Sequence, residues 1–455
     1  MYIDFLLSVF RNNAAAEAMV WRDQSFSFGS LTEALQKWRD RLSKEGISAS
    51  VVSLEADFSP TSVALLLALM ECGCIIAPFT ASVEASKLVF REIAQVETVI
   101  RVAEDDSVSI NHTNRNADHQ LMRELKERRR PGLILFSSGS TGESKAAVHD
   151  FVPLLEKFHV PRTSSRMAAF LLFDHIGGIN TLLYALSNAG CLIVLGNRLP
   201  EAVCAAIEKH RIQVLPTSPT FLNLMLLSEA YKAYDLSTLA LVTYGTEVMP
   251  ESTLKRFCEL SPNIRVQQTY GLSELGILRS KSKSSDSLWL KVGGEGYQTR
   301  VIDGLLEIKA QSAMLGYLNA PNPFTDDGWF KTGDAVESDG EYMRILGRKC
   351  EVINVGGEKV YPAEVESILQ SMSGVKEAVV VGEPNRITGQ IVKAQIRVAT
   401  AESPAEFRRR MHEFCRNKLP KYKIPAKVVL VQEPLHSERY KKMRAAGAGL
   451  PAETA

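Results

Sequence analysis

The sequence has few cysteines, almost no net charge and no long unbroken apolar run, and each of these shortages argues against a class of protein. Its 455 residues include seven cysteines at irregular spacing, which argues against a disulfide framework. The formal net charge is +1, so composition gives no support for binding nucleic acid or a membrane surface. Cys72 and Cys74 stand close together, but no second Cys or His pair at zinc-like spacing accompanies them.

The longest apolar run, residues 62–79, is interrupted by Glu71 and Gly73. A membrane span needs about 20 apolar residues, so a core helix followed by a buried strand explains this run better. The first residues place Asp4 inside a short apolar stretch and lack a basic leader, so we expect no signal peptide. We therefore expect a cytoplasmic protein without a membrane span.

Short apolar runs alternate with amphipathic stretches along most of the chain. The runs that we predict to be strands are residues 74–79, 132–136, 191–196, 212–217 and 239–245. Strands that alternate with helices indicate an α/β fold with largely parallel sheets. Two polar segments break this pattern: we predict an exposed connection with a short helix over 104–130 and a flexible loop over 280–287.

The pattern changes past residue 347. The chain is longer than the roughly 250–300 residues that one hydrophobic core usually serves, so at least two domains are expected. We predict a large N-terminal domain with parallel-sheet layers over residues 1–347 and a small α+β C-terminal domain over 348–455. In the smaller domain the predicted helices are 361–370 and 404–419, and the predicted strands are 375–382 and 391–398.

The loop after the strand at 132–136 is rich in glycine and hydroxyl side chains, and residues 137–145 read SSGSTGESK. A Walker A loop is excluded, because Ser144 stands five places after Gly139 where that motif requires a glycine followed by lysine. Glycines nevertheless let successive backbone N–H groups point into one concavity, and Lys145 adds a mobile positive charge. The loop therefore favours a phosphate cradle, with a strand-to-helix turn rich in capping residues as the alternative.

Five motifs, in order along the chain, resemble those of the adenylate-forming (AMP-binding) superfamily, in particular its acyl- and aryl-CoA ligases. The superfamily also includes peptide-synthetase adenylation domains and luciferases. The resemblance extends from about residue 15 to about residue 445. The motifs are SSGSTGESK (137–145), QTYGLSE (268–274), GWFKTGD (328–334), GRKCEVINVGGEKVYPAEVE (347–366) and ERYKKMR (438–444).

The resemblance implies a reaction in two steps. A small carboxylic acid attacks the α-phosphate of ATP to give an acyl-adenylate and pyrophosphate, and a thiol then displaces AMP. The implied cofactors are ATP, Mg²⁺ and coenzyme A, or the phosphopantetheine of a carrier protein, which we expect to be a separate chain. Both steps concentrate negative charge, so the site should consist of preplaced donors and a cation.

By the same resemblance, particular residues are expected to bind ATP. Ser273 would contact phosphate, and Glu274 would help to hold Mg²⁺, a hard cation that favours carboxylate oxygen. Tyr270 would pack against adenine, although an aromatic residue here could equally belong to the core. Asp334 and Arg348 would bind the ribose. The residues expected to clasp the β- and γ-phosphates are Ser137, Ser138, Gly139, Ser140, Thr141, Gly142 and Lys145.

Lys441 is the candidate for the catalytic lysine that bridges the substrate carboxylate and the α-phosphate. The family pattern is Gly-Lys-x-x-Arg, and the spacing from Lys441 to Arg444 keeps it. Lys442 is an adjacent rival, and Tyr440 replaces the glycine of the pattern.

The family rotates its small domain about a hinge between the two steps. Gly356 and Gly357, in the glycine loop 354–360, would then line the tunnel for the pantetheine arm. Cys350 stands at the hinge position, where the family usually has Asp or Lys. Ser144 replaces the usual proline of the phosphate loop without removing a charge or a donor, so we expect that loop to function.

The stretch 170–194 bears on the substrate. Phe173-Asp174 imitates the pair with which amino-acid-activating domains hold an ammonium group, whereas His175 matches the CoA ligases, with Gly190 fifteen residues on. We favour the CoA-ligase interpretation. The expected pocket walls are His175, Gly178, Tyr244, Gly245, Thr246 and Leu272.

Thr246 stands where the family often has a smaller residue, so it predicts a short or flat acid rather than a long fatty acid. Two alternatives to the ligase remain open. One is a stand-alone adenylation enzyme that loads an aryl or amino acid onto a carrier protein, and the other is a catalytically degenerate nucleotide-binding protein. His149 follows Lys145 at the spacing of one helical turn, and we expect it to cap or to face solvent.

Overall fold

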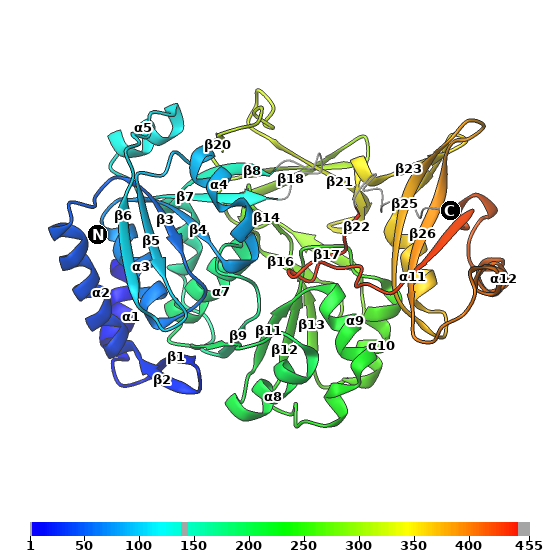
Figure 1. The fold of residues 1–455 in the computed structure, drawn as a ribbon, viewed down its shortest axis with the longest axis horizontal. Helices are drawn as coiled ribbons and strands as arrows, with labels where there is room; N and C mark the ends of the chain where they lie inside the picture. Colours follow the sequence, from blue (N-terminus) through cyan, green and yellow to red (C-terminus); the bar gives the residue numbers. More distant parts are fainter. Residues whose placement is uncertain (1, 138–143, 445–455) are drawn as a thin grey trace, which may run out of the picture.

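The computed structural model describes residues 2–137 and 144–444. Its N-terminal part contains two seven-stranded sheets (Figure 1). The first has the order β13-β12-β11-β9-β10-β1-β2 and is parallel except at the β1–β2 hairpin. Its strands are β1 (Glu17–Trp21), β2 (Gln24–Ser27), β9 (Arg166–Ala169), β10 (Cys191–Val194), β11 (Val214–Thr217), β12 (Leu241–Tyr244) and β13 (Arg265–Gln268).

The second sheet has the order β20-β8-β7-β4-β3-β5-β6. Its central strands β7, β4, β3 and β5 are parallel, and the outer strands β20, β8 and β6 are antiparallel to their neighbours. The predicted parallel layers are confirmed by these two sheets. The strands are β3 (Val51–Glu55), β4 (Ile75–Phe79), β5 (Thr98–Val102), β6 (Val108–His112), β7 (Gly132–Ser137), β8 (Lys145–Asp150) and β20 (Gly316–Tyr317).

Helices fill the space between these sheets and cover the outer face of the first. The predicted core helix is α3 (Pro60–Glu71), in which ten of the twelve residues are buried, as expected for a helix that is apolar all round. It shares one hydrophobic cluster with α1 (Asp4–Asn12), α2 (Phe28–Lys44) and α7 (Ile176–Ser187). A second cluster joins the first sheet to α8 (Pro200–His210), α9 (Pro219–Ser228) and α10 (Glu251–Leu260).

A third, six-stranded sheet is antiparallel and completes the N-terminal part. The expected loop over 280–287 is wrong at its start, because Ser280–Ser282 pairs with the next strand as β16. The other strands of this sheet are β17 (Trp289–Val292), β18 (Tyr297–Ile302), β19 (Leu305–Ala310), β21 (Phe330–Asp339) and β22 (Tyr342–Arg348). A short hairpin, β14 (Gly271–Leu272) and β15 (Gly276–Ile277), precedes it.

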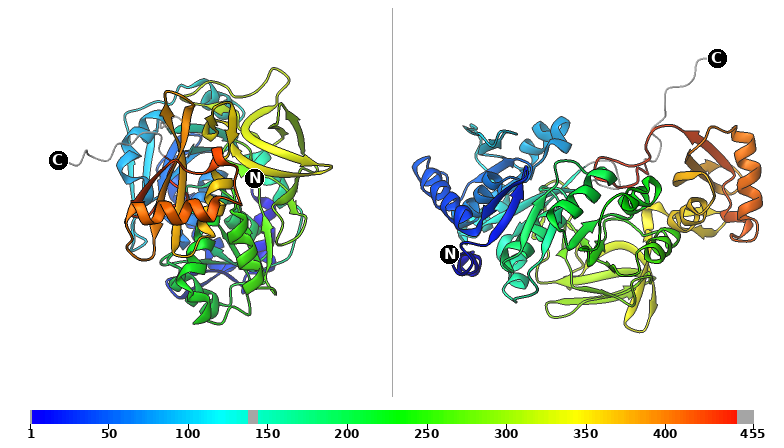
Figure 2. Two further views of the ribbon diagram at one scale, coloured as in Figure 1. Left: turned by 90° about the vertical axis from the view of Figure 1, so that its right-hand side faces the viewer. Right: turned by 90° about the horizontal axis from the view of Figure 1, so that it is seen from below.

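The C-terminal residues form a separate lobe around a five-stranded sheet (Figures 1 and 2). Helices α11 (Pro362–Gln370) and α12 (Pro404–Cys415) pack on this sheet through their own hydrophobic cluster, which confirms the predicted α+β unit. The strands are β23 (Ile353–Val355), β24 (Glu358–Val360), β25 (Val375–Asn385), β26 (Gly389–Val398) and β27 (Lys427–Val431). The exact domain boundary at 347/348 stays a prediction, since β22 ends at Arg348 and the new sheet begins at Ile353.

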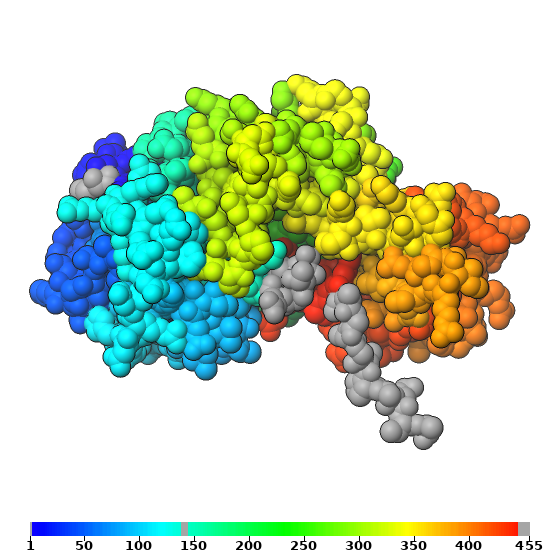
Figure 3. Space-filling model, turned by 90° about the horizontal axis from the view of Figure 1, so that it is seen from above, coloured from blue at the N-terminus to red at the C-terminus, as the bar shows by residue number. Residues whose placement is uncertain are grey.

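After β27 the chain turns back toward the N-terminal part. Figure 3 shows this last described segment, in red, in the hollow between the two lobes. Within residues 2–137 and 144–444, no helix has both the length and the apolar character needed to cross a membrane.

Candidate active site

A cavity of about 2040 Å³ lies where the first sheet, the third sheet and the returning C-terminal segment meet. The carboxyl ends of β12 and β13 open into it, as expected for a ligand site in an open α/β sheet. Most of the predicted site residues that the structure describes line this one cavity. These are Ser137, Lys145, His175, Gly245, Thr246, Tyr270, Leu272, Ser273, Glu274, Asp334, Arg348 and Lys441.

The remaining predicted site residues divide into two groups. Ser138, Gly139, Ser140, Thr141 and Gly142 lie outside the described residues, so their expected phosphate contacts stay predictions. The lining of the cavity does not include Gly178, Tyr244, Gly356 and Gly357.

Asp334, Arg348 and Tyr270 form a hydrogen-bonded group on one wall of the cavity. Asp334 on β21 lies opposite Arg348 at the end of β22, and Arg348 Nε is 2.7 Å from Asp334 Oδ1. The hydroxyl of Tyr270 donates to Asp334 Oδ2 at 2.5 Å. Burial raises the pKa of Asp334, although both partners favour its charged form. Tyr270 belongs to a hydrophobic cluster and also lines the cavity, so its expected packing against adenine stays a prediction.

Glu274 reaches the cavity from the loop between β14 and β15. Its Oε1 accepts a hydrogen bond from the Tyr317 hydroxyl at 2.6 Å, and Lys145 Nζ lies 5.5 Å from the centre of the Tyr317 ring. In the part of the chain that the structure describes, no three His, Cys, Asp or Glu side chains gather as a metal site. One carboxylate together with ATP phosphates is a usual environment for Mg²⁺, so Glu274 fits the expected role.

His149 is buried near the end of β8, and the expectation that it caps a helix or faces solvent is wrong. Its Nε2 donates to the backbone oxygen of Ser273 at 2.6 Å and so holds the loop that carries Glu274. Burial lowers the pKa of His149, which keeps the ring neutral. The segment is not helical, because Lys145–Asp150 pairs with β7 along one edge and with β20 along the other.

Lys441 and its rival Lys442 both line the cavity, but Lys442 is held in an ion pair. Lys442 Nζ is 2.7 Å from Glu366 Oε2 in the C-terminal lobe. No carboxylate among the described residues lies within ion-pair distance of Lys441 Nζ. Burial lowers the pKa of Lys441, an effect that the charge of Glu247 partly opposes. This arrangement leaves Lys441 free for an anionic ligand and favours it over Lys442.

Tyr440, which directly precedes Lys441, packs against the N-terminal part. Its φ of 53° lies in the left-handed region, where the glycine of the family pattern would be unstrained. The ring centre lies 5.5 Å from each of the Phe170 and Phe221 ring centres. The hydroxyl donates to the Arg198 backbone oxygen at 2.7 Å. The aromatic contacts therefore hold an unfavourable backbone conformation that places Lys441 in the cavity.

Asp174 does not line the cavity, although it directly precedes His175. Its Oδ2 accepts from the Thr80 hydroxyl at 2.9 Å and from Arg439 Nη2 at 2.8 Å. Asp174 therefore fastens the returning C-terminal segment, and this occupation disfavours a role in binding a substrate ammonium group.

We predict that Asp174→Asn slows adenylate formation by about tenfold with every acid, because it weakens a charge-assisted bond worth roughly 1.5–3 kcal/mol. The order of preference among acids should not change. Arg439→Met should have a similar effect, measured as initial rates with several acids. A selective loss of activity toward amino acids alone would contradict this role for Asp174.

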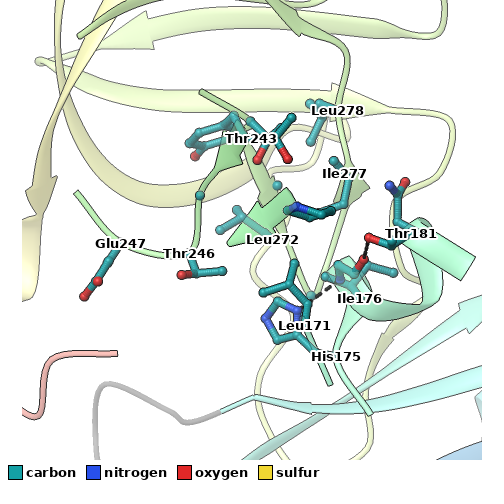
Figure 4. A pocket seen from close by; sticks show the side chains of 18 of the residues that line it. Leu171, His175, Ile176, Thr181, Thr243, Thr246, Glu247, Leu272, Ile277 and Leu278 are labelled. Carbon is teal, nitrogen blue, oxygen red and sulfur yellow. Dashed lines mark hydrogen bonds between the residues drawn. The ribbon is translucent and has the colours of Figure 1, made fainter. Parts of the chain in front are cut away.

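His175 is held as a neutral donor. Its Nδ1 accepts a hydrogen bond from the Gly177 backbone at 3.0 Å, which places the ring proton on Nε2. Burial, together with the charges of Lys441 and Arg439, lowers the pKa of His175 to about 3. Figure 4 shows its ring at the start of α7, close to Leu171.

Two of the six expected pocket residues have structural roles instead. A Cβ on Gly178 would lie 1.9 Å from the Leu172 backbone oxygen, so this glycine permits α7 to approach the preceding loop. Tyr244 is 1% exposed, and its hydroxyl donates to Gln268 within the core. Side chains alternate between the faces of a strand, which explains why Tyr244, the last residue of β12, points away while its neighbours Thr243 and Gly245 line the cavity.

The glycine loop lies outside the cavity in this arrangement. Gly356 and Gly357, with φ of +62° and +93°, form the turn between β23 and β24. Lys441 lines the cavity at the same time, which is the arrangement that the resemblance implies for adenylation, and the expected role of the two glycines stays a prediction. Cys350 is exposed in the short helical turn Lys349–Glu351, and its role as hinge stays a prediction.

Sequence reasoning missed several residues that line the cavity. Glu247 accepts from the Thr220 backbone at 2.8 Å and from the Lys442 backbone at 3.1 Å, which ties the two lobes together. Its position directly after the predicted pocket residues Gly245 and Thr246 was a usable signal. The lining also includes Lys157 and Arg279, for which the sequence carries no motif, and Arg439, which stands in the motif of residues 438–444 but received no role.

Comparison with known proteins agrees with this geometry. The model of the AMP-binding enzyme family matches residues 8–294, and that of the AMP-binding enzyme C-terminal domain matches residues 364–442. A 2-succinylbenzoate–CoA ligase of Enterococcus faecalis is 27% identical over 452 residues, covering 90% of this chain and 91% of that protein.

Solved structures with the same fold include the anthranilate CoA ligase AuaEII, with a TM-score of 0.79 and 19% identity over 95% of this chain and 93% of that one. The o-succinylbenzoate CoA synthetase of Bacillus subtilis has a TM-score of 0.76 and 20% identity, covering 97% and 96% of the two chains. On the match of both domain models, this chain belongs to the AMP-binding enzyme family of the adenylate-forming superfamily.

Proposed function

We propose that the protein is an AMP-forming acid–CoA ligase, which activates a carboxylic acid with ATP and transfers the acyl group to coenzyme A. The observation that carries this proposal is that Lys441 lines the same cavity as Glu274 and the Asp334–Arg348 pair. Lys441 has no ion-pair partner among the described residues. The names of the relatives, which are CoA ligases of aryl and other carboxylic acids, support the same class of reaction.

In the first step, a carboxylate oxygen of the acid attacks the α-phosphorus of ATP, and the bond to the pyrophosphate oxygen breaks. Lys441 would neutralise charge that develops between the two anionic groups, and Nε2–H of His175 would orient the acid. Asp334 and Arg348 would hold the ribose. Glu274 would hold Mg²⁺, which neutralises phosphate charge when bound.

In the second step, the thiol sulfur attacks the acyl carbon, and AMP leaves as the acyl–phosphate bond breaks. The pantetheine arm needs room that Lys441 and its neighbours occupy in the described arrangement. We therefore propose that the C-terminal lobe turns about the segment near Cys350, which withdraws Lys441 and presents Gly356 and Gly357.

The test of this proposal is product analysis after incubation with ATP, Mg²⁺, coenzyme A and a panel of carboxylic acids. The expected result is one equivalent each of AMP, pyrophosphate and acyl-CoA for the preferred acid, identified by mass spectrometry. Adenylate formation without any thioester would instead indicate an enzyme that loads a separate carrier protein.

Thr246 is the residue that we expect to limit the size of the acid. It lines the cavity with φ of 73°, a conformation that is strained for a β-branched residue. Its hydroxyl is buried and has no hydrogen-bond partner among the described residues. Figure 4 shows Thr246 beside Glu247, across the pocket from Leu171 and His175.

We predict that Thr246→Gly raises kcat/KM for bulkier acids by about tenfold, since a misfitting group in a packed pocket costs about 1–3 kcal/mol. The free energy of unfolding should not fall, because glycine accepts this backbone conformation without strain. Kinetics with a graded series of acids and a thermal melt check both points. Wild-type kinetics that improve steadily up to sixteen-carbon acids would contradict the predicted short or flat substrate.

A further inference from the structure

Lys157 is a buried cation without an anionic partner inside the cavity. It lies in the helical turn Glu156–Phe158 after α6 (Phe151–Leu155). Its Nζ donates to Asn180 Oδ1 and, at 2.8 Å, to the Ile277 backbone oxygen. An ammonium group has three donors, and the third has no hydrogen-bond acceptor in the described part of the chain, although the Phe158 ring centre lies 5.0 Å from Nζ. Burial, followed by the charge of Arg279, lowers the pKa of Lys157 to about 7.

Arg279 is the second cation in this region. It lines the same cavity, and its guanidinium forms no ion pair with any carboxylate that the structure describes. Two buried or half-buried cations close enough to repel each other are unfavourable unless an anion lies between or beside them.

The charges that line the cavity are unevenly distributed. Of its four acidic residues, Glu247, Glu274, Asp334 and Glu351, none acts on the pKa of Lys157, which responds only to burial and to Arg279. Their hydrogen bonds or ion pairs involve Tyr317 or residues of the linker and C-terminal segment. No carboxylate among the described residues forms an ion pair with Lys157 or Arg279. An anion can therefore enter this region without meeting a like charge.

The two ends of the cavity are joined by one face of α7. His175 precedes this helix, and Ile176, Asn180, Thr181 and Tyr184 line the cavity along it. Asn180, which binds Lys157, follows His175 by five positions, or about 7.5 Å along a helix. Figure 4 shows His175, Ile176 and Thr181 succeeding one another along this face, with Ile277 opposite. A substrate carboxylate beside His175 would thus have Lys157 at the other end of a short molecule.

We propose that Lys157 and Arg279 bind a second carboxylate of the substrate, so that the enzyme activates a dicarboxylic acid at the end that faces Lys441. This inference rests on the proposed acid–CoA ligase function and names the class of its substrate. The apolar wall between the two charged ends, made by Ile176, Ile277 and Leu278, would hold the carbon skeleton.

The test compares matched acids in ATP–pyrophosphate exchange. The pairs are hexanoate with adipate, octanoate with suberate, and 4-phenylbutanoate with its ring-carboxylated analogue. The expected kcat/KM of wild type is at least about tenfold higher for the better-fitting diacids than for their monoacid partners, as expected from a charge-assisted bond. Lys157→Met should lower kcat/KM for the diacid roughly 10- to 100-fold. It should leave kcat/KM for the monoacid within about threefold of the wild-type value.

Two further variants separate binding from folding. Arg279→Met should also lower kcat/KM for the diacid. Lys255→Met removes an exposed ion pair on α10 and should change kcat/KM for neither acid. A wild-type enzyme that uses monoacids as well as diacids would overturn the subsite and leave the ligase function standing. Equal losses for both acids in Lys157→Met would assign Lys157 a structural role. Failure of every acid would contradict the ligase function itself.

The pH dependence gives an independent readout. The group facing Lys157 that carries charge is Arg279, while Asn180 and the Ile277 carbonyl are neutral. As pH rises through about 7, unliganded Lys157 loses its proton, so KM for a diacid should rise toward tenfold per pH unit. KM for the matched monoacid should not follow this rise. Parallel pH profiles for the two acids would overturn the proposal.

Discussion

Replacing Lys441 by alanine should slow adenylate formation by about 10²–10³-fold, as expected for the loss of one preplaced cation at a developing charge. Conversion of chemically prepared acyl-adenylate and coenzyme A to thioester should remain near wild type, because Lys441 must leave the cavity for that step. Rapid-quench measurement of a single turnover in each half-reaction would separate the two effects.

Lys442→Met is the matched control. Lys442 is bound to Glu366, so its loss should affect the stability of the C-terminal lobe more than the chemistry. If Lys441→Ala left adenylation intact and Lys442→Met abolished it, the assignment of the catalytic lysine would be wrong while the family would stand.

Replacing Glu366 by glutamine should lower the free energy of unfolding of the C-terminal lobe by about 3–5 kcal/mol, since it leaves the buried Lys442 without a carboxylate partner and Arg444 with Glu351 alone. Glu366 on α11 is fully buried and accepts from Lys442 Nζ at 2.7 Å and from Arg444 Nη2 at 2.7 Å. Lys442 directly follows Lys441 and Arg444 lies three residues after it, so the same change should also slow adenylate formation. Urea unfolding at neutral pH measures the stability, with Glu364→Gln, in an exposed pair on the same helix, as control.

The stabilisation by Glu366 should depend on pH in a defined direction. Burial alone would raise the pKa of Glu366, but Lys442 and Arg444 lower it to about 2. Its contribution to stability is therefore complete above the unfolded value of about 4.5 and is lost as pH falls toward 2. The difference in free energy of unfolding between wild type and Glu366→Gln should therefore become smaller as the pH falls over that range. A gap that stays constant with pH would show that Glu366 does not act through its charge.

The parts of the fold that the sequence predicted are those fixed by local patterns. The buried strands β4, β7, β10, β11 and β12 appear as apolar runs because both faces of their sheets are covered. The helices α11 and α12 follow from amphipathic spacing and proline at the first turn. The strand β8 was missed because its residues, KAAVHD, are small or polar, and its pairing partners lie elsewhere in the chain.

The candidate site could be predicted only where motifs carry it. Lys441, Glu274 and Asp334 stand in such motifs, and the structure brings all three to one cavity. The roles of Asp174 and Lys157 could not be predicted, because they depend on Arg439 and on Ile277, each more than one hundred residues away in the chain. Burial of a charged side chain is a property of the packed fold and leaves no local signature.

The most direct test of the central claim is ATP–pyrophosphate exchange by the wild-type protein, with monocarboxylic, dicarboxylic and amino acids supplied one at a time. The account predicts exchange that requires both Mg²⁺ and an acid, and that is strongest for one class of acid. No exchange with any acid, from folded protein that still binds ATP, would contradict it and identify a nucleotide-binding protein that has lost its catalysis.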